Sequence, residues 1–399
     1  MAKVAILGLG TVGSGVAEVL TKNADSIARK AGEPVEIKYI LGRHDYPDSP
    51  FRDLVVQDFS VIENDPEISV VAECIGGTGA ARDDTLRALR AGKSVVTSNK
   101  EVVAEYGDEF FAIAQEKNLN YLYEASVGGG IPIIRPLGSC LAANEISEIY
   151  GILNGTTNYI LTKMIKEGLS FDTALKQAQE KGYAEADPTA DVEGFDACRK
   201  ICILASLSFG RHVYPAQVPT QGITGVTAQD VALAEAAGMK IKLLGRAILQ
   251  EDGKVVAYVA PHLIPVDQQM AGVEDVFNGI VVRGDAIGDV MFYGRGAGKL
   301  PTASAVAADI IDAVKHHDRR QNLDWAPGGD DVVGSFEDLP LRWYLRTPEQ
   351  DTKITAVFGG GKTVTAGEEK AVFTGLLTKR ELDQKLTEFR VLTCLPVLA

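Results

Sequence analysis

Near its start the chain reads Lys3-Val4-Ala5-Ile6-Leu7-Gly8-Leu9-Gly10-Thr11-Val12-Gly13-Ser14-Gly15, and this stretch decides the fold class. A short apolar run ends in a glycine-rich turn, and apolar residues then recur at helical spacing. Gly8, Gly10 and Gly13 have the G-x-G-x-x-G spacing, which permits a tight turn, close approach of the backbone to a pyrophosphate, and close packing of helix on strand. The strand-to-helix context favours a dinucleotide-binding domain over a tight turn that is merely rich in glycine.

The sequence that follows alternates between strand and helix patterns. Apolar runs that read as strands cover residues 35–41, 70–74, 94–97 and 120–124, and helical patterns cover residues 83–91 and 102–117. Such alternation predicts an α/β fold with a Rossmann-type, mostly parallel, doubly wound sheet. We expect this domain to span residues 1–135.

The end of the second strand bears on the choice of cofactor. It reads Gly42-Arg43-His44-Asp45. An acid at this position favours a free ribose hydroxyl, whereas an arginine can hold a 2′-phosphate. Both are present, and we expect Arg43 to bind the phosphate, so that NADP is preferred and NAD is tolerated.

Two later strand ends carry polar residues, Ile75-Gly76-Gly77-Thr78 and Thr97-Ser98-Asn99-Lys100. Parallel sheets hold ligands at the carboxyl ends of their strands, so we expect Lys100 to reach the cofactor or the substrate. The alternative, a solvated lysine at the start of a helix, is unfavourable because the positive end of the helix dipole repels a cation.

A third loop, Glu124-Ala125-Ser126-Val127-Gly128-Gly129-Gly130-Ile131-Pro132, follows the strand at residues 120–124. Its carbonyl oxygens could converge with Glu124 on a hard cation. A flexible hinge between domains explains the three glycines equally well.

A cluster of acids precedes one lysine in the stretch Gly182-Tyr183-Ala184-Glu185-Ala186-Asp187-Pro188-Thr189-Ala190-Asp191-Val192-Glu193-Gly194-Phe195-Asp196-Ala197-Cys198-Arg199-Lys200. Turn residues give way to helical spacing near Phe195, so Asp196 and Lys200 share one helix face. In a cleft such a pair can bind a polar substrate and move protons. From spacing alone a surface ion pair is the commoner explanation.

The second half of the chain is α+β rather than a repeat of the first domain. We expect a substrate-binding, catalytic and dimerisation domain over residues 136–320 and a linker rich in Gly, Pro and Asp over residues 321–338. Residues 339–399 follow the order βαββαβ, which predicts a small ferredoxin-like module.

Composition excludes several classes of protein. A net charge of −14 argues against a general nucleic-acid surface, because phosphate binding needs a basic patch. No apolar stretch approaches the length of a membrane span, and the N-terminus lacks a signal-peptide pattern, so we expect no membrane contact and a cytoplasmic location. The five cysteines have neither a disulfide framework nor zinc spacing.

Taken in order, these segments resemble the homoserine dehydrogenase family over roughly the first 320 residues. The resemblance rests on residues 8–15, Ser98-Asn99-Lys100, residues 124–132 and 182–200, and Gly296-Ala297-Gly298 followed by Pro301-Thr302-Ala303. It implies reversible NAD(P)H-dependent reduction of L-aspartate 4-semialdehyde to L-homoserine, on the route to threonine and methionine. It also implies a homodimer or homotetramer.

The resemblance assigns a role to each matching residue. Lys200 would be the acid/base lysine, with Asp196 and Lys100 also catalytic. Substrate would be bound by Glu185, Asp191, Asp196 and Lys100. A sodium ion would be held by Glu124, Val127, Gly129 and Ile131. Cofactor contacts would come from Gly8, Gly10, Thr11, Val12, Gly13, Arg43, Lys100, Gly182 and Gly298.

The tail resembles the ACT modules that bind amino acids in many of these enzymes, with one departure. Those modules usually carry Asp-x-Pro-Gly before the first helix, where this chain has Pro348-Glu349-Gln350-Asp351-Thr352. Without the glycine, backbone amides cannot approach a small amino acid closely. We therefore expect the tail to support self-association and threonine to inhibit weakly or not at all.

Two other functions compete with this interpretation. A phosphorylating semialdehyde dehydrogenase would need a thiol nucleophile; Cys74 and Cys140 lie near glycine loops, but neither has a histidine nearby in sequence. The second is a regulatory protein that has kept the fold and lost catalysis, and the intact pair of Asp196 and Lys200 argues against it.

Overall fold

The computed structural model describes residues 1–359 and 361–398, which form two compact units that are each discontinuous in sequence. The first contains residues 1–145, 203–215 and 294–328, and the second contains residues 146–202, 216–293 and 329–399. The predicted boundaries at residues 135, 320 and 338 remain predictions. Within the described residues, no helix combines the length and apolar character needed to cross a membrane.

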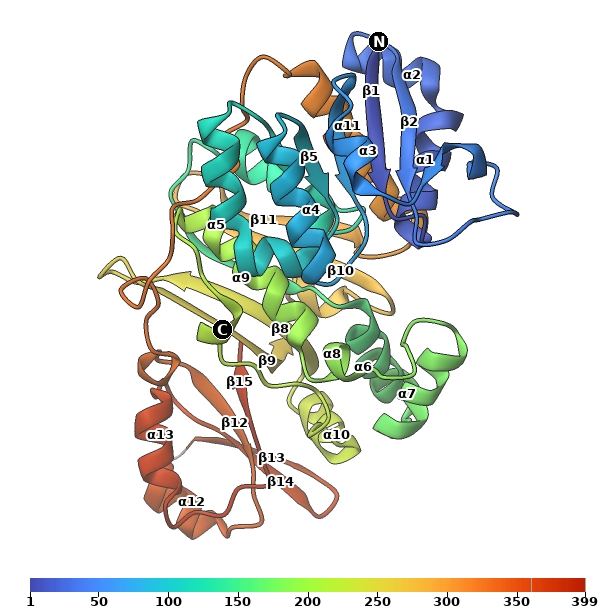
Figure 1. The fold of residues 1–399 in the computed structure, drawn as a ribbon. Helices are drawn as coiled ribbons and strands as arrows, with labels where there is room; N and C mark the ends of the chain where they lie inside the picture. The colour runs from blue at the N-terminus through green and yellow to red at the C-terminus, as the bar shows by residue number, and fades with distance from the viewer. Residues whose placement is uncertain (360, 399) are drawn as a thin grey trace. The chain divides into compact units, whose positions relative to one another are not determined.

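The first unit is built on a six-stranded parallel sheet, as its alternating pattern predicted (Figure 1). In the strand order β3-β2-β1-β4-β5-β6, the chain adds strands on one side of β1 up to β3 and then on the other side from β4 onward, so the order reverses between β1 and β4. Its strands are β1 (Ala2–Leu7), β2 (Val35–Leu41), β3 (Val55–Val56), β4 (Ile68–Glu73), β5 (Ser94–Thr97) and β6 (Tyr121–Leu122). Ligands of such sheets bind outside the carboxyl ends of the strands at this reversal.

Helices cover both faces of this sheet, which explains why almost every residue of β4 and β5 is buried. One group of packed helices is α1 (Thr11–Lys22), α2 (Ala24–Ala31) and α11 (Lys299–Lys315), and the other is α4 (Gly79–Arg90) and α5 (Lys100–Glu116), with the short α3 (Phe59–Glu63) beside α4. No local pattern indicated that α11, nearly 300 residues along the chain, would pack on α1.

The second unit contains a nine-stranded mixed sheet in the order β11-β10-β7-β8-β9-β15-β12-β14-β13. Its strands are β7 (Ile146–Ile152), β8 (Met239–Leu249), β9 (Val255–Pro265), β10 (Phe277–Gly284), β11 (Gly288–Arg295), β12 (Arg342–Arg346), β13 (Lys362–Ala366), β14 (Glu369–Phe373) and β15 (Thr393–Val397). Its helices are α6 (Gly155–Glu167), α7 (Phe171–Glu180), α8 (Thr189–Val192), α9 (Phe195–Phe209, which ends in the first unit), α10 (Ala228–Ala236), α12 (Asp351–Phe358) and α13 (Lys379–Leu386).

The tail has the predicted order β12-α12-β13-β14-α13-β15 (Figure 1). Its strands are antiparallel in the order β15-β12-β14-β13, which is the ferredoxin-like arrangement. β15 also joins β9, through the single parallel pair Leu263 and Val397. Tyr258 of β9 shares an apolar cluster with Leu341 and Trp343, so the tail and the larger part of this unit have a common core.

Strand β8 carries one buried lysine among its apolar residues. Lys242 interrupts the apolar pattern, yet it is only 1% exposed. Its ammonium donates to the side-chain oxygen of Asn158 at 3.0 Å and to the carbonyl of Val273 at 2.5 Å. Burial lowers the pKa of Lys242 to about 7.

Candidate active site

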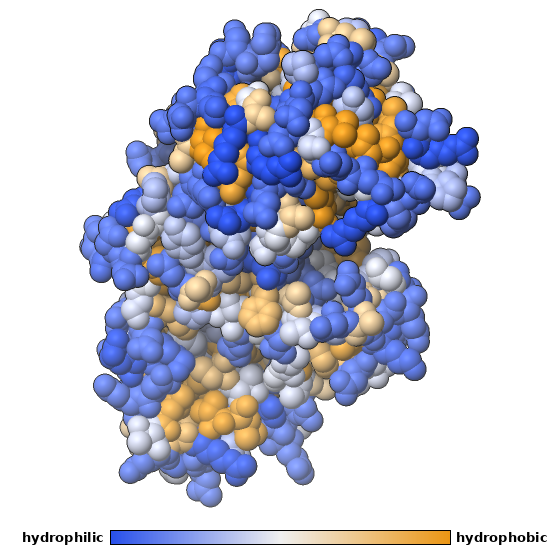
Figure 2. All heavy atoms as spheres, in the orientation of Figure 1, coloured by the Kyte–Doolittle hydropathy of each residue, from blue (hydrophilic) through white to orange (hydrophobic). Residues whose placement is uncertain are grey.

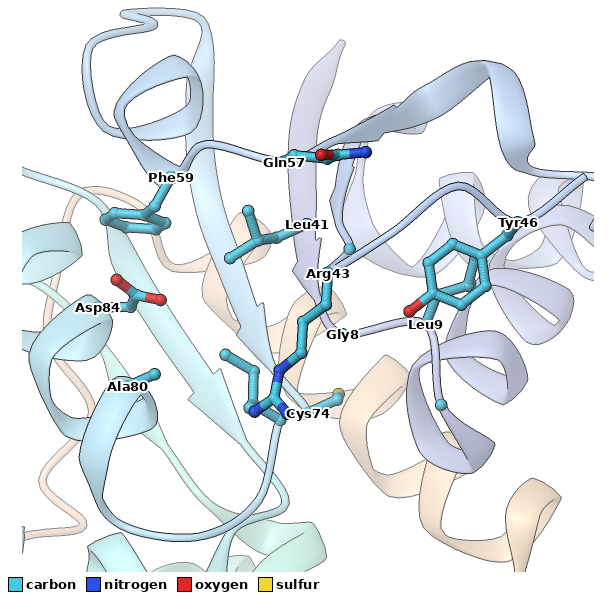
Figure 3. A pocket seen from close by; sticks show the side chains of 13 residues that line it. Gly8, Leu9, Leu41, Arg43, Tyr46, Gln57, Phe59, Cys74, Ala80 and Asp84 are labelled. Atoms are coloured by element: carbon cyan, nitrogen blue, oxygen red, sulfur yellow. The ribbon is translucent and has the colours of Figure 1, made fainter.

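The glycine-rich turn of the first unit opens onto a cavity of about 390 Å³ (Figure 3). The cavity lies at the carboxyl ends of β1, β2 and β4, beside α4. It is lined by Gly8, Leu9, Gly10, Leu41, Gly42, Arg43, Tyr46, Gln57, Phe59, Cys74, Ile75, Ala80 and Asp84. This is the position at which a doubly wound sheet binds its ligand.

The three motif glycines are required for different reasons. Gly8 has a φ of +96°, in the region that favours glycine. A Cβ on Gly13 would lie 1.9 Å from the carbonyl oxygen of Gly8, so only glycine permits this contact between helix and turn. A Cβ on Gly10 would meet nothing within 4 Å. Open space at Gly10 fits the close approach of a pyrophosphate.

The first turn of α1 starts immediately after Gly10. Thr11 and Val12 are its first two residues, and no side chain caps the helix. The exposed N–H groups and the positive end of the helix dipole therefore favour an anion at this point. The residues present thus fit a dinucleotide phosphate.

At the end of β2, the arginine and the acid of the sequence prediction are separated. Arg43 lines the cavity, and Figure 3 shows its side chain extending across it. Asp45 is not among the lining residues and instead accepts a hydrogen bond from Gln57 Nε2 at 3.1 Å.

A buried glutamate that the sequence did not single out organises two of the strand ends. Glu73 is 0% exposed and accepts hydrogen bonds from Ile75 N (2.7 Å) and Thr97 Oγ1 (2.6 Å). Asn99 donates to the carbonyl of Gly77 at 2.7 Å and caps α5. Lys100 is therefore the first residue of a firmly anchored helix, although it does not line the cavity.

The predicted cation loop has an unexpected arrangement of its acid. Glu124 is buried, and its carboxylate accepts three backbone N–H groups, from Ile133 (2.6 Å), Ile134 (2.9 Å) and Arg135 (2.9 Å). These donors occupy both oxygens of the carboxylate. A cation here would depend on carbonyl oxygens, and the three other predicted ligands, Val127, Gly129 and Ile131, all lie in the same loop.

In the second unit, Asp196 and Lys200 form a buried ion pair. They are 4% and 8% exposed, and Lys200 Nζ lies 2.7 Å from Asp196 Oδ2. The ammonium also donates to the carbonyl of Leu153 at 2.8 Å. The surface-pair explanation is therefore wrong for these residues, because a surface pair would be solvated.

Asn154 connects this ion pair to a second acid, a role that sequence reasoning missed. Its amide nitrogen donates to Asp191 Oδ1 at 2.7 Å and to Asp196 Oδ2 at 2.9 Å. Its side-chain oxygen accepts from Thr157 N at 2.8 Å and so caps α6. The available signal, an Asn-Gly pair between a strand and a helix, indicated only the cap.

The other acids of the stretch have distinct environments. Burial raises the pKa of Asp191, and the Asn154 hydrogen bond opposes that rise. Asp187 accepts hydrogen bonds from Thr189 N and Thr189 Oγ1, a local turn that precedes α8. The side chain of Glu185 is exposed, and within the described ranges 1–359 and 361–398 its carboxylate accepts no hydrogen bond.

The structure thus brings together Asp191, Asp196 and Lys200 in one unit and Gly8, Gly10 and Arg43 in the other. The other predicted cofactor residues lie outside the cavity lining: Thr11, Val12, Gly13, Lys100, Gly182 and Gly298. Gly182 lies in the exposed turn after α7, with a φ of +73°, and Gly298 precedes α11, with a φ of +119°.

The cysteines have little capacity for nucleophilic chemistry. Burial strongly raises the pKa of Cys74, so its thiol stays protonated at neutral pH. Cys140 is exposed, but within the part of the chain that the structure describes it forms no hydrogen bond or ion pair with a histidine or any other base that could activate it.

Family models match nearly all of the first 311 residues. Residues 8–124 match the model described as "Homoserine dehydrogenase, NAD binding domain", and residues 132–311 match the model described as "Homoserine dehydrogenase". Among curated proteins, the homoserine dehydrogenase of Bacillus subtilis is 41% identical over 374 residues, which cover 89% of this chain and 84% of that protein. The homoserine dehydrogenase of Synechocystis is 47% identical over 360 residues, which cover 86% and 82%.

Solved structures give the same result. The homoserine dehydrogenase of Thiobacillus denitrificans aligns with a TM-score of 0.91 at 34% identity and covers 100% of this chain and 98% of that one. A hyperthermophilic archaeal homoserine dehydrogenase in complex with NADPH aligns with a TM-score of 0.66 at 28% identity, covering 78% and 97%.

Proposed function

Because this chain belongs to the homoserine dehydrogenase family, we propose that its buried Asp196–Lys200 pair performs the proton transfer of that family's reaction. The chain is an NAD(P)-dependent oxidoreductase that reduces L-aspartate 4-semialdehyde to L-homoserine, a step of amino-acid biosynthesis. The observation that carries the proposal is the ammonium of Lys200, held between a carboxylate and a carbonyl at 2.7 and 2.8 Å.

Reduction of an aldehyde needs a hydride and a proton. Reduced nicotinamide supplies the hydride. As negative charge develops on the carbonyl oxygen, Lys200 Nζ stabilises it and donates a proton to it; in the reverse direction the neutral amine removes the proton from the hydroxyl group. Asp196 holds the lysine in position. Lys100 contributes a second positive charge in this proposal.

The substrate carries an ammonium group that needs an acceptor. We propose that Asp191 and Glu185 supply it, together with Asp196, because carboxylates form strong charge-assisted hydrogen bonds with ammonium. Asn154 acts as a positioning residue in this scheme. It fixes the two aspartates relative to each other through its single amide group.

NADP is the proposed preferred cofactor. Arg43 lines the cavity as the predicted 2′-phosphate ligand, while Asp45 is bonded to Gln57 rather than directed at the ligand. We also propose a sodium ion at the loop of Glu124, Val127, Gly129 and Ile131, bound chiefly by carbonyl oxygens. Assays in which tetramethylammonium replaces sodium would test it; unchanged activity and stability would contradict it.

For the tail we propose support of self-association rather than binding of amino acids. In the loop at Pro348–Thr352, Glu349 is already bonded within the protein, because its Oε1 accepts hydrogen bonds from Lys353 Nζ (2.7 Å) and Arg390 N (3.1 Å). Leu376 and Leu392 are 64% and 44% exposed, and Figure 2 shows apolar residues gathered over the tail.

Titration of the intact enzyme with threonine tests the proposal for the tail. We expect at most weak inhibition, because an effector can act only through a difference in affinity between two states. Strong inhibition that is lost on Glu349→Ala would contradict it. A homodimer or homotetramer and a cytoplasmic location also remain predictions, for light scattering and cell fractionation to test.

The experiment for the function itself is NADPH oxidation with L-aspartate 4-semialdehyde, with and without a thiol-alkylating reagent. We expect activity that survives alkylation. Absence of NADPH oxidation with the semialdehyde, together with phosphate-dependent reduction of NADP+ that alkylation abolishes, would indicate thiol chemistry instead.

A further inference from the structure

Asp84 of α4 is an acid in the wall of the cofactor cavity to which neither the motif nor the proposed reaction gives a role. The residue is 9% exposed and lies beside Phe59 and Ala80 (Figure 3). The side chains of Phe59, Ala80 and Leu41 near it are apolar. A carboxylate in such surroundings is unfavourable unless it receives hydrogen bonds.

The protein itself offers few interactions that would offset the burial of the Asp84 carboxylate. The nearest cation, Arg87 Nη1, is 3.7 Å away, beyond hydrogen-bond distance. The guanidinium of Arg87 is engaged by Glu63, whose oxygens both lie 3.2 Å from Nε. Throughout residues 1–359 and 361–398, Asp84 accepts no hydrogen bond. Burial accordingly raises the pKa of the Asp84 carboxyl despite the attraction of Arg87.

The shape of the cavity indicates which donor Asp84 receives. Gly8 and Gly10 lie at the phosphate end, and Arg43 is the proposed 2′-phosphate ligand. Beyond Arg43 the wall includes the apolar side chains of Leu41, Phe59 and Ala80 and the carboxylate of Asp84. The amide nitrogen of Gln57, which also lines the cavity, is already bonded to Asp45. An apolar slot with an acceptor at its edge suits a flat heteroaromatic ring that bears an N–H group.

We propose that Asp84 selects the adenine base of the dinucleotide by accepting a hydrogen bond from its exocyclic amino group. This inference rests on the proposed cofactor site. It predicts discrimination against a 6-oxopurine, because the base then presents an oxygen to the carboxylate in place of the N–H donor. Sites built to bind an N–H group reject analogues that lack it far more strongly than apolar pockets reject small changes of shape.

The alternative role for Asp84 is structural, as a partner that holds Arg87 on α4. Loss of such a contact would weaken the binding of every dinucleotide to the same degree. The ratio of two affinities separates the two roles, because a general loss of structure cancels in the ratio.

The test is calorimetric titration of the intact protein with NADPH and with reduced nicotinamide hypoxanthine dinucleotide phosphate, its 6-oxo analogue. We expect the wild-type protein to bind NADPH at least tenfold more tightly. Asp84→Asn should bring the ratio of dissociation constants close to one, because an amide can both accept from an amino group and donate to a carbonyl. Asp83→Asn, an exposed neighbour with the same change of charge, should keep the wild-type ratio.

Equal binding of the two dinucleotides by the wild-type protein would overturn the inference, and this measurement needs no variant. A ratio that persists in Asp84→Asn would also overturn it. If the enzyme oxidises NADPH with the semialdehyde while binding both dinucleotides equally, the proposed function stands and only the role of Asp84 fails. Failure of both dinucleotides to bind would overturn the cofactor site and the inference together.

Discussion

Replacement of Asn154 by serine would separate catalysis from helix stability at the proposed catalytic centre. Serine keeps an oxygen at the N-cap of α6, and serine and asparagine are comparable caps, so the helix should lose little. The variant removes the amide nitrogen that lies 2.7 Å from Asp191 and 2.9 Å from Asp196. Asp196 keeps Lys200 as a partner, but its position relative to Asp191 is no longer fixed.

The size of the effect follows from those two hydrogen bonds. A hydrogen bond to a charged group contributes about 1.5–3 kcal/mol. If the bond to Asp196 is needed in the transition state, its loss raises the barrier by that amount, and each 1.36 kcal/mol is a factor of ten in rate. We therefore expect kcat to fall roughly 10- to 100-fold. Affinity for NADPH should stay within about twofold, because none of these residues lines the cofactor cavity.

The assay is NADPH oxidation with L-aspartate 4-semialdehyde, combined with urea unfolding and direct titration of NADPH. Ser170→Ala is the matched control, since Ser170 caps α7 of the same unit through Thr173 N at 3.3 Å. It should lose about 1 kcal/mol of stability and keep its kcat. A kcat within twofold of wild type in folded Asn154→Ser would refute the positioning role. An equal loss of kcat in Ser170→Ala would show that activity merely follows stability.

Two further predictions concern single side chains. Arg43→Ala should weaken the binding of NADPH at least tenfold and leave the binding of NADH almost unchanged, because only NADPH carries the 2′-phosphate. Equal losses of affinity for both cofactors would mean that Arg43 contacts another part of the cofactor. The pKa of Lys242 is about 7 in the folded protein and higher in the unfolded chain, so the unfolded chain binds more protons between those pH values. The free energy of unfolding should therefore rise with pH, by roughly 2 to 4 kcal/mol between pH 7 and pH 10. Urea unfolding of Lys242→Met should lack this rise, and a rise of the same size in both proteins would contradict the assignment.

The sequence alone predicted those elements whose structure is determined by neighbouring residues in the chain. Backbone geometry dictates Gly8 and Gly13, and open space at Gly10 leaves room for a pyrophosphate, so their spacing indicated the sheet and the cavity together. Asp196 and Lys200 were paired correctly because four residues along a helix is a fixed separation. The order of the tail followed from turns and periodicity in the same way.

The features that escaped prediction depend on partners distant in sequence. Glu73 and Thr97 meet only when β4 and β5 pair. The bridging contacts of Asn154 could not be predicted, because Asp191 and Asp196 lie 37 and 42 residues away in the sequence. The hydrogen-bond partners of the buried Lys242, Asn158 and Val273, lie 84 and 31 residues away in the sequence.

The assignment of Lys200 as the acid/base residue is the central claim, and a comparison of two lysines tests it most directly. NADPH oxidation with L-aspartate 4-semialdehyde should be measured for Lys200→Ala and for Lys176→Ala, an exposed lysine of α7. We expect Lys200→Ala to lose roughly 100-fold or more in kcat with unchanged NADPH affinity, and Lys176→Ala to behave as wild type. A folded Lys200→Ala protein that turns over at nearly the wild-type rate would contradict the account.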